Sequence, residues 1–143
     1  MKTLLLAEDN DSDAYIMQLA CRRSGIPHVL QIVNDGEKVI EYLSGKGKFH
    51  DRSIYPLPNL IFLDIDMPKQ NGHDVLQWIR NNEALRRIPV VMITGSKLDS
   101  DIERAYKLGA ISYLQKLPEL GAFGQAVRVI LKYWLELNIC PPA

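Results

Sequence analysis

The sequence has little cysteine, no net charge and no long apolar run. Cys21 and Cys140 lie far apart without metal-ligand spacing, which argues against a disulfide framework or a cysteine metal site. We interpret both as buried or idle thiols of a cytoplasmic protein. The 17 basic residues balance the 17 acidic ones, so no general field attracts nucleic acid or an anionic membrane. The longest apolar runs have strand length, far short of a membrane span.

The remaining composition is that of a globular domain. A chain of 143 residues with 47% hydrophobic content is long enough to bury most of its apolar surface in one domain. Segments of helical spacing alternate strictly with short apolar runs, which predicts parallel strands with crossover helices on both faces of one sheet. The five runs are Leu4–Ala7, Val29–Val33, Leu60–Leu63, Val90–Ile93 and Ile111–Leu114. The first begins almost at Met1, so we expect no signal peptide.

The run Leu60–Leu63 is the central feature of the sequence. Its continuous apolar character is typical of a strand buried on both faces, and Pro68 ends it because proline has no backbone donor. Asp64 follows the run directly. A carboxylate there requires a hydrogen bond, a counter-charge or a metal, although capping the next turn would also satisfy a single Asp. In open α/β sheets this position is where ligands bind.

Polar residues follow four of the five predicted strands, and parallel strands place them on one edge of the sheet. Several carboxylates crowded together repel one another, and a hard divalent cation such as Mg²⁺ relieves the repulsion. A hydroxyl and an ammonium at the same edge supply a hydrogen bond and a positive partner for a phosphoryl group. The residues are Glu8 and Asp9, Asp64 and Asp66, Thr94, and Lys116. Together they indicate a carboxylate nucleophile, a metal and a phosphoryl clamp.

Local signals place the helix starts. Asp11, Ser12 and Asp13 are candidate caps for the first helix, in a turn suited to negative charge. Ser100 and Glu103 have the spacing of a capping box. The polar segment from Ser44 to Pro58 is long for a connection in an α/β domain, so it is either functional or a tolerated surface insertion.

The last helix, from about Glu119 to Leu137, has an unusually wide apolar arc. One face carries Leu120, Phe123, Val127, Ile130, Leu131 and Trp134. Ala122, Ala126, Val129, Tyr133 and Leu137 extend the apolar surface around the side. Because a helix packed on a sheet needs a narrower stripe, we expect the extra flank either to cover the Cys140–Pro142 tail or to form a dimer surface.

Taken in order, these motifs resemble those of a response-regulator receiver domain, the phosphoacceptor half of two-component signalling. The matching stretches are Leu5–Asn10, Leu63–Pro68 with Asn71-Gly72, Ile93–Ser96, and Ala105–Ala110 with Tyr113–Lys116. The resemblance covers nearly the whole chain and implies a single receiver domain over residues 1–143. It implies a flavodoxin-like, doubly wound parallel sheet of order 2-1-3-4-5 flanked by five helices.

The resemblance also implies a role for each site residue. Asp64 matches the phosphorylated aspartate, Thr94 the switch hydroxyl, and Lys116 the lysine that contacts the phosphoryl group. Tyr113 matches the aromatic residue whose orientation follows the switch. For Mg²⁺, Asp9 and the Asp64 carboxylate match side-chain ligands, Asp66 supplies a backbone carbonyl, and Glu8 acts mainly through water.

The function implied is transfer of a phosphoryl group from a histidine kinase to Asp64, followed by a change in a protein-interaction surface. Such a protein is not an enzyme in the usual sense, since it catalyses only its own phosphotransfer and dephosphorylation. The segment before Pro58, the Gln115-Lys116 pair and the terminal Trp134–Leu137 stretch resemble regulators paired with phytochrome kinases. Those relatives form homodimers through the fourth helix, fifth strand and fifth helix, so residues 118–143 are the expected dimer face. We expect no output domain and no nucleic-acid or membrane partner.

One departure from the family keeps alternatives open. Where receivers usually have Lys-Pro, often with a cis bond, this chain has Lys116-Leu117-Pro118. A cis bond before leucine costs about 2.5–4 kcal/mol, against about 0.5–1 before proline, so the loop is either strained or rearranged. A receiver fold used as a phosphorylation-independent interaction module is one alternative. An Asp-x-Asp phosphatase using Asp64 and Asp66 is another, although that motif belongs on the first strand.

Overall fold

The computed structural model describes residues 1–142 and has one five-stranded parallel sheet in the order β2-β1-β3-β4-β5. The strands are β1 (Thr3–Ala7), β2 (Val29–Val33), β3 (Leu60–Leu63), β4 (Val90–Thr94) and β5 (Ser112–Gln115). The helices are α1 (Asp11–Arg23), α2 (Gly36–Ser44), α3 (Gly72–Asn81), α4 (Asp99–Lys107) and α5 (Leu120–Leu131), with a short 3₁₀ helix η1 (Gly47–His50) and a π-helical segment η2 (Lys132–Leu137). The predicted flavodoxin-like α/β fold is confirmed.

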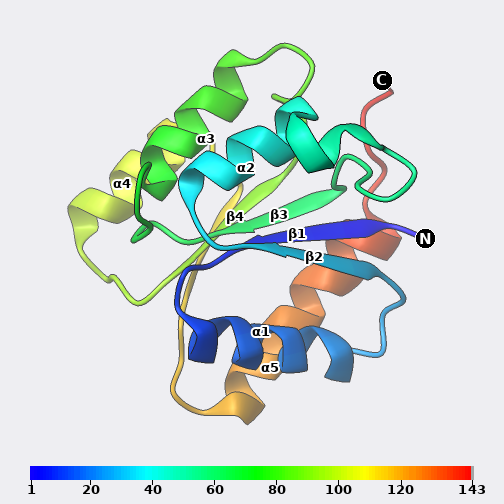
Figure 1. Ribbon diagram of the computed structural model, residues 1–143. Helices are drawn as coiled ribbons and strands as arrows, with labels where there is room; N and C mark the ends of the chain where they lie inside the picture. The colour runs from blue at the N-terminus through cyan, green and yellow to red at the C-terminus, as the bar shows by residue number, and fades with distance from the viewer. Residues whose placement is uncertain (143) are drawn as a thin grey trace.

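Helices cover both faces of the sheet (Figure 1). On one face, α2, α3 and α4 pack over side chains such as Leu5 and Ile61. On the other, α1 and α5 pack over side chains such as Leu4 and Leu60. Alternate residues of β1 and β3 therefore enter different cores, which is why both strands are continuously apolar. Burying each of these side chains contributes roughly 1.5–3 kcal/mol.

Two expected helix caps are corrected. The N-cap of α1 is Asn10, whose side chain accepts from the Asp13 N–H, so Asp11, Ser12 and Asp13 are first-turn residues instead. Helix α4 begins at Asp99 rather than after Ser100, and its N-cap residue, Leu98, offers no side-chain bond. The capping box is therefore wrong, because the loop before α4 is already organised by other hydrogen bonds.

The segment from Ser44 to Pro58 is built around an aromatic cluster. Tyr42, Phe49 and Tyr55 have ring centroids 5.1–6.0 Å apart, and the Tyr42 hydroxyl donates to the Pro56 carbonyl. The Arg52 guanidinium donates to the carbonyls of Tyr42, Leu43 and Tyr55 at 2.8–3.1 Å. Since the last carbonyls of a helix lack intrahelical partners, Arg52 satisfies the carboxyl end of α2.

The terminal segment leaves part of its apolar arc uncovered. Helix α5 continues into η2, and the tail then reaches Arg87, whose guanidinium donates to the Pro142 carbonyl at 3.0 Å. Val129, Tyr133 and Leu137 remain exposed, so the tail does not cover this flank. The expected dimer face 118–143 ends with Ala143, which lies outside the described residues.

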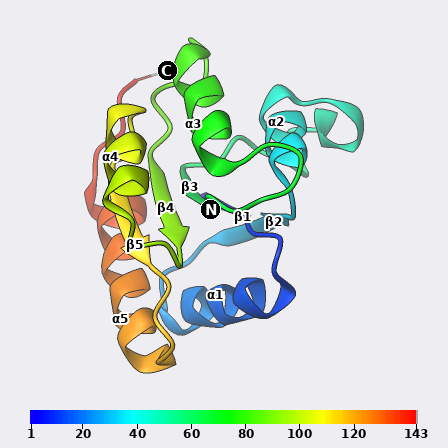
Figure 2. The same ribbon diagram turned by 90° about the vertical axis from the view of Figure 1, so that its left-hand side faces the viewer.

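The carboxyl ends of the strands meet at one edge of the sheet, which faces the viewer in Figure 2. After β1 the chain crosses to β2 on one side, and after β3 it crosses to β4 on the other. The ends of β1 and β3 therefore flank the point where the winding direction reverses, the position at which such sheets bind ligands. Within residues 1–142, no helix has the length and apolar character that a membrane span requires.

Candidate functional site

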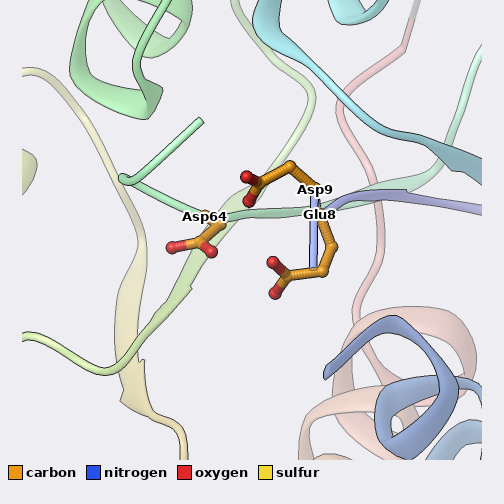
Figure 3. A group of neighbouring side chains, drawn as sticks. All are labelled: Glu8, Asp9 and Asp64. Carbon is orange, nitrogen blue, oxygen red and sulfur yellow. The ribbon is translucent and has the colours of Figure 1, made fainter. Parts of the chain in front are cut away.

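The strand ends bring three carboxylates together. Glu8 and Asp9 follow β1 and Asp64 follows β3, and each residue offers an oxygen within 4.8 Å of the other two (Figure 3). Backbone bonds from Glu8 N–H to Val33 and from Asp64 N–H to Ala7 extend the sheet ladder past the strands. These bonds fix the backbone from which two of the carboxylates project.

A glycine allows the next helix to approach this backbone. Gly72 opens α3, and its N–H donates to the Ile65 carbonyl at 2.8 Å. A Cβ at this position would collide with the Asp64 carbonyl oxygen. Gly72 is therefore required for the close contact that packs α3 behind Asp64.

Lys116 supplies the positive charge of the site. Its Nζ lies 2.6 Å from Glu8 Oε1 and 2.9 Å from Asp64 Oδ2. The Lys116 N–H donates to the Thr94 carbonyl at 2.8 Å, which continues the β4–β5 ladder to this residue. No peptide bond among residues 1–142 is cis. The Lys116-Leu117 sequence is thus accommodated by a trans bond, with the ammonium in contact with Asp64.

Burial sets the electrostatics of these groups. The Glu8 and Asp64 side chains are only 3% and 5% exposed. Burial raises the pKa of Glu8 to about 7, with the Lys116 hydrogen bond opposing this and the Asp64 charge adding to it. Burial alone would lower the pKa of Lys116, but the hydrogen bonds that it donates to Asp13, Glu8 and Asp64 raise it overall. Lys116 therefore stays charged beside these two buried carboxylates.

The remaining predicted residues lie at the same edge with different contacts. The buried Thr94 hydroxyl accepts from the Ser96 N–H at 3.4 Å. The Tyr113 hydroxyl donates to the Ser96 carbonyl at 3.1 Å, and burial raises the pKa of this phenol. The Asp66 side chain is exposed, and its N–H donates to Asp64 Oδ1 at 3.3 Å. Thr94 and Tyr113 therefore both contact the loop between β4 and α4.

A fourth carboxylate, Asp13, was missed as a site residue. Its Oδ2 lies 2.8 Å from Lys116 Nζ, although the sequence indicated only a helix cap. A usable signal existed, because α1 begins two residues after Asp9 and its first turn must lie at the edge that holds Asp64.

The site has the shape and donors for a hard cation. A hollow of about 330 Å³ opens over the carboxylates. Its walls are formed by Glu8, Asp9, Asn10, Asp13, Asp64, Asp66, Gly95 and Lys116. The convergent donors are carboxylate oxygens, with no sulfur or imidazole among these residues, and such a set suits Mg²⁺ or Mn²⁺ rather than a soft metal.

Comparison with known proteins identifies the family. The family model described as the response regulator receiver domain matches residues 4–128. The chain belongs to this family. It is 37% identical over 142 residues to the response regulator Rcp1 of Synechocystis sp., covering 99% of this chain and 95% of Rcp1. This membership leaves the Asp-x-Asp phosphatase interpretation without support.

Two solved structures extend the similarity. The phosphorylated cyanobacterial phytochrome response regulator RcpA is 34% identical, with a TM-score of 0.90 and 99% coverage of both chains. The Mn²⁺-bound form of Rcp1 is 36% identical, with a TM-score of 0.87, 99% coverage of this chain and 100% of the other. The receiver is therefore similar to phytochrome-linked regulators of two-component signalling, as the sequence predicted.

Proposed function

We propose that this receiver accepts a phosphoryl group on Asp64 from the phosphohistidine of a histidine kinase. The observation that carries the proposal is the ammonium of Lys116, 2.9 Å from Asp64 Oδ2 within a group of carboxylates able to share a cation. An Asp64 oxygen attacks the phosphorus, and a P–O bond forms as the N–P bond breaks. The electron pair of the broken bond stays on the imidazole nitrogen, and the product is an acyl phosphate.

The chain itself supplies positioning and charge neutralisation for this step. Lys116 contacts the phosphoryl oxygens, and the Thr94 hydroxyl turns from Ser96 to donate to them. Glu8, Asp9 and Asp64, with the backbone carbonyl of Asp66, would hold Mg²⁺, and the bound cation would neutralise charge on the phosphoryl group. The reaction consumes the carboxylate until hydrolysis restores it, so the protein is a phosphoacceptor rather than a turnover enzyme.

Phosphorylation adds roughly −1.5 to −2 charge next to the β4–α4 loop. The space released when Thr94 turns away from Ser96 lets Tyr113, whose hydroxyl is bonded to the Ser96 carbonyl, repack inward. The face of α4, β5 and α5 then changes its affinity for partners, which is a population shift biased by local charge.

The similarity to Rcp1 and RcpA supports a phytochrome-type histidine kinase as the phosphodonor. We propose that the transfer takes place in the cytoplasm. The exposed Val129, Tyr133 and Leu137 support a homodimer through the α4–β5–α5 face. The balanced net charge argues against nucleic acid as a partner. We treat residues 1–143 as one receiver unit whose terminal part, 118–143, serves the dimer.

The test is incubation with acetyl phosphate and Mg²⁺, followed by intact mass, with Asp64→Asn in parallel. We expect one phosphoryl adduct on the wild type only, and none when Mg²⁺ is removed by chelation. No adduct and no binding of beryllofluoride would reject the proposal in favour of a phosphorylation-independent interaction module. Sustained turnover of a phosphomonoester would instead favour a phosphatase.

A further inference from the structure

The Lys116 ammonium has one partner that does not follow a strand. Its Nζ contacts Glu8 Oε1 at 2.6 Å, Asp64 Oδ2 at 2.9 Å, and Asp13 Oδ2 in the first turn of α1 at 2.8 Å. A lysine ammonium has three N–H donors, so these three acceptors use all of them. Lys116 cannot gain a phosphoryl contact without giving up one of the three.

The three acceptors differ in their surroundings. The Asp13 side chain is 37% exposed, whereas those of Glu8 and Asp64 are nearly buried. Asp13 therefore keeps part of its hydration and loses less solvation free energy in the ion pair. Its backbone is fixed as well, because the Asp13 N–H donates to the Asn10 side chain at 2.9 Å. Asp13 is thus an anchored carboxylate that need not itself react or bind metal.

The same ion pair separates two cavities. Glu8, Asp13 and Lys116 border the hollow of the site and also a cavity of about 30 Å³ behind it. The rest of the smaller cavity is lined by Leu6, Ile16, Met17, Ile93, Leu117 and Phe123. The Asp13–Lys116 contact bridges α1 and the chain after β5.

We propose that Asp13 is a positioning residue for Lys116. It holds the ammonium by one fixed charged bond while the bond to Asp64 is exchanged for a bond to the phosphoryl group. This inference rests on the proposed phosphoacceptor function, although the holding of Lys116 is measurable without it.

The test compares three variants. Asp13→Ala removes the charge and the acceptor, and Asp13→Asn removes the charge but keeps an acceptor oxygen. Asp11→Ala is the matched control, because Asp11 is an exposed acid in the same first turn of α1 without a hydrogen bond or ion pair to Lys116. Any loss of helix-dipole stabilisation is common to Asp11→Ala and Asp13→Ala. The difference between Asp13→Asn and Asp13→Ala isolates the hydrogen bond.

The first readout is the side-chain ammonium signal of Lys116 in ¹⁵N-edited NMR of the metal-free protein, assigned by its absence in Lys116→Met. An ammonium held by three carboxylates exchanges slowly enough to be observed. We expect the signal in the wild type, Asp11→Ala and, shifted, Asp13→Asn, and its broadening beyond detection in Asp13→Ala. An unchanged signal in Asp13→Ala would overturn the proposal.

The second readout is the rate of phosphorylation by acetyl phosphate with excess Mg²⁺. We expect about a tenfold loss in Asp13→Ala, as for a displaced catalytic charge, with rescue to within about threefold in Asp13→Asn. Wild-type rates in Asp13→Ala would reject the positioning role. If the wild type itself is not phosphorylated, the proposed function fails, and the NMR result still decides whether Asp13 holds Lys116.

Discussion

Two cations, Lys116 and Arg52, are each held by three oxygens, but the oxygens differ in kind. Lys116 contacts ionisable side chains that follow β1 and β3 and one in the first turn of α1. Arg52 contacts only backbone carbonyls, two from α2 and one from Tyr55. A carbonyl keeps the same partial charge in every signalling state, whereas a carboxylate can be protonated, bind a metal or be phosphorylated. This difference in acceptors indicates that the contacts of Lys116 can change between signalling states, whereas those of Arg52 stay fixed.

Arg80 follows the Arg52 pattern. Its guanidinium donates to the carbonyls of Gly109, Arg86 and Ile88 at 2.8–3.0 Å, joining α3 to the loops before β4 and β5. Both arginines thus fix loops by fork-shaped donation to neutral acceptors. Lys116 is a point charge on a flexible stem, and such a group exchanges partners readily.

The largest effect on the phosphorylation rate should come from removing Lys116, the cation whose acceptors can change. In Lys116→Ala the rate of phosphorylation by acetyl phosphate should fall about 100- to 1,000-fold, because one preorganised donor to developing charge is lost. The rate is measured as adduct formation by intact mass. Lys97→Ala, which removes an exposed lysine of the β4–α4 loop, is the control and should retain the wild-type rate. A Lys116→Ala rate within threefold of wild type would contradict the proposed functional difference between Lys116 and Arg52.

Removing Arg52, the cation held by backbone carbonyls, should reduce the stability of the fold rather than the phosphorylation rate. Arg52→Ala leaves the Leu43 and Tyr55 carbonyls without their donor, while the Tyr42 carbonyl keeps its bond from the Gly45 N–H. We expect the free energy of unfolding to fall by about 2–3 kcal/mol in urea titrations. Arg52→Lys should recover only part of this, since one ammonium cannot reproduce the guanidinium fork. Phosphorylation should stay within twofold of wild type. A loss below about 0.5 kcal/mol would mean that the Ser44–Pro58 segment is a loosely attached insertion.

A smaller effect, with a characteristic pH dependence, is expected at Tyr42. Its hydroxyl donates to the Pro56 carbonyl at 2.8 Å, and burial raises its pKa to about 12. Because the folded pKa exceeds the value of about 10 in an unfolded chain, this contribution to stability is complete below pH 10 and is lost as the pH rises through 12. Tyr42→Phe should therefore cost about 1 kcal/mol at pH 7, and this deficit should shrink and then disappear as the pH rises from 10 towards 12. Urea unfolding of both proteins across this range measures it, and a constant deficit would contradict the assignment.

The sequence predicted the acidic edge because the relevant information is local. Glu8 and Asp64 directly follow apolar runs, with Asp9 and Asp66 close behind, and parallel topology then places the ends of the runs together. Asp13 does not follow an apolar run, and an acid in the first turn of a helix already has a sufficient local explanation. The topology placed this turn at the acidic edge, but the contact with Lys116 joins residues 103 positions apart, which no local pattern indicates. Arg52 was missed for a related reason. Its partners are backbone carbonyls, which every residue carries and no sequence pattern displays.

Amide hydrogen exchange with and without beryllofluoride and Mg²⁺ tests the contrast most directly, with Asp64→Asn as the control for site occupancy. We expect altered protection in 94–98 and 113–117, around Thr94, Tyr113 and Lys116, and unchanged protection in 42–55 around Arg52. Equal changes of amide protection in both regions would contradict the account, which assigns the switch to Lys116 and its carboxylate partners. So would unchanged protection at the acidic edge of a protein that binds beryllofluoride.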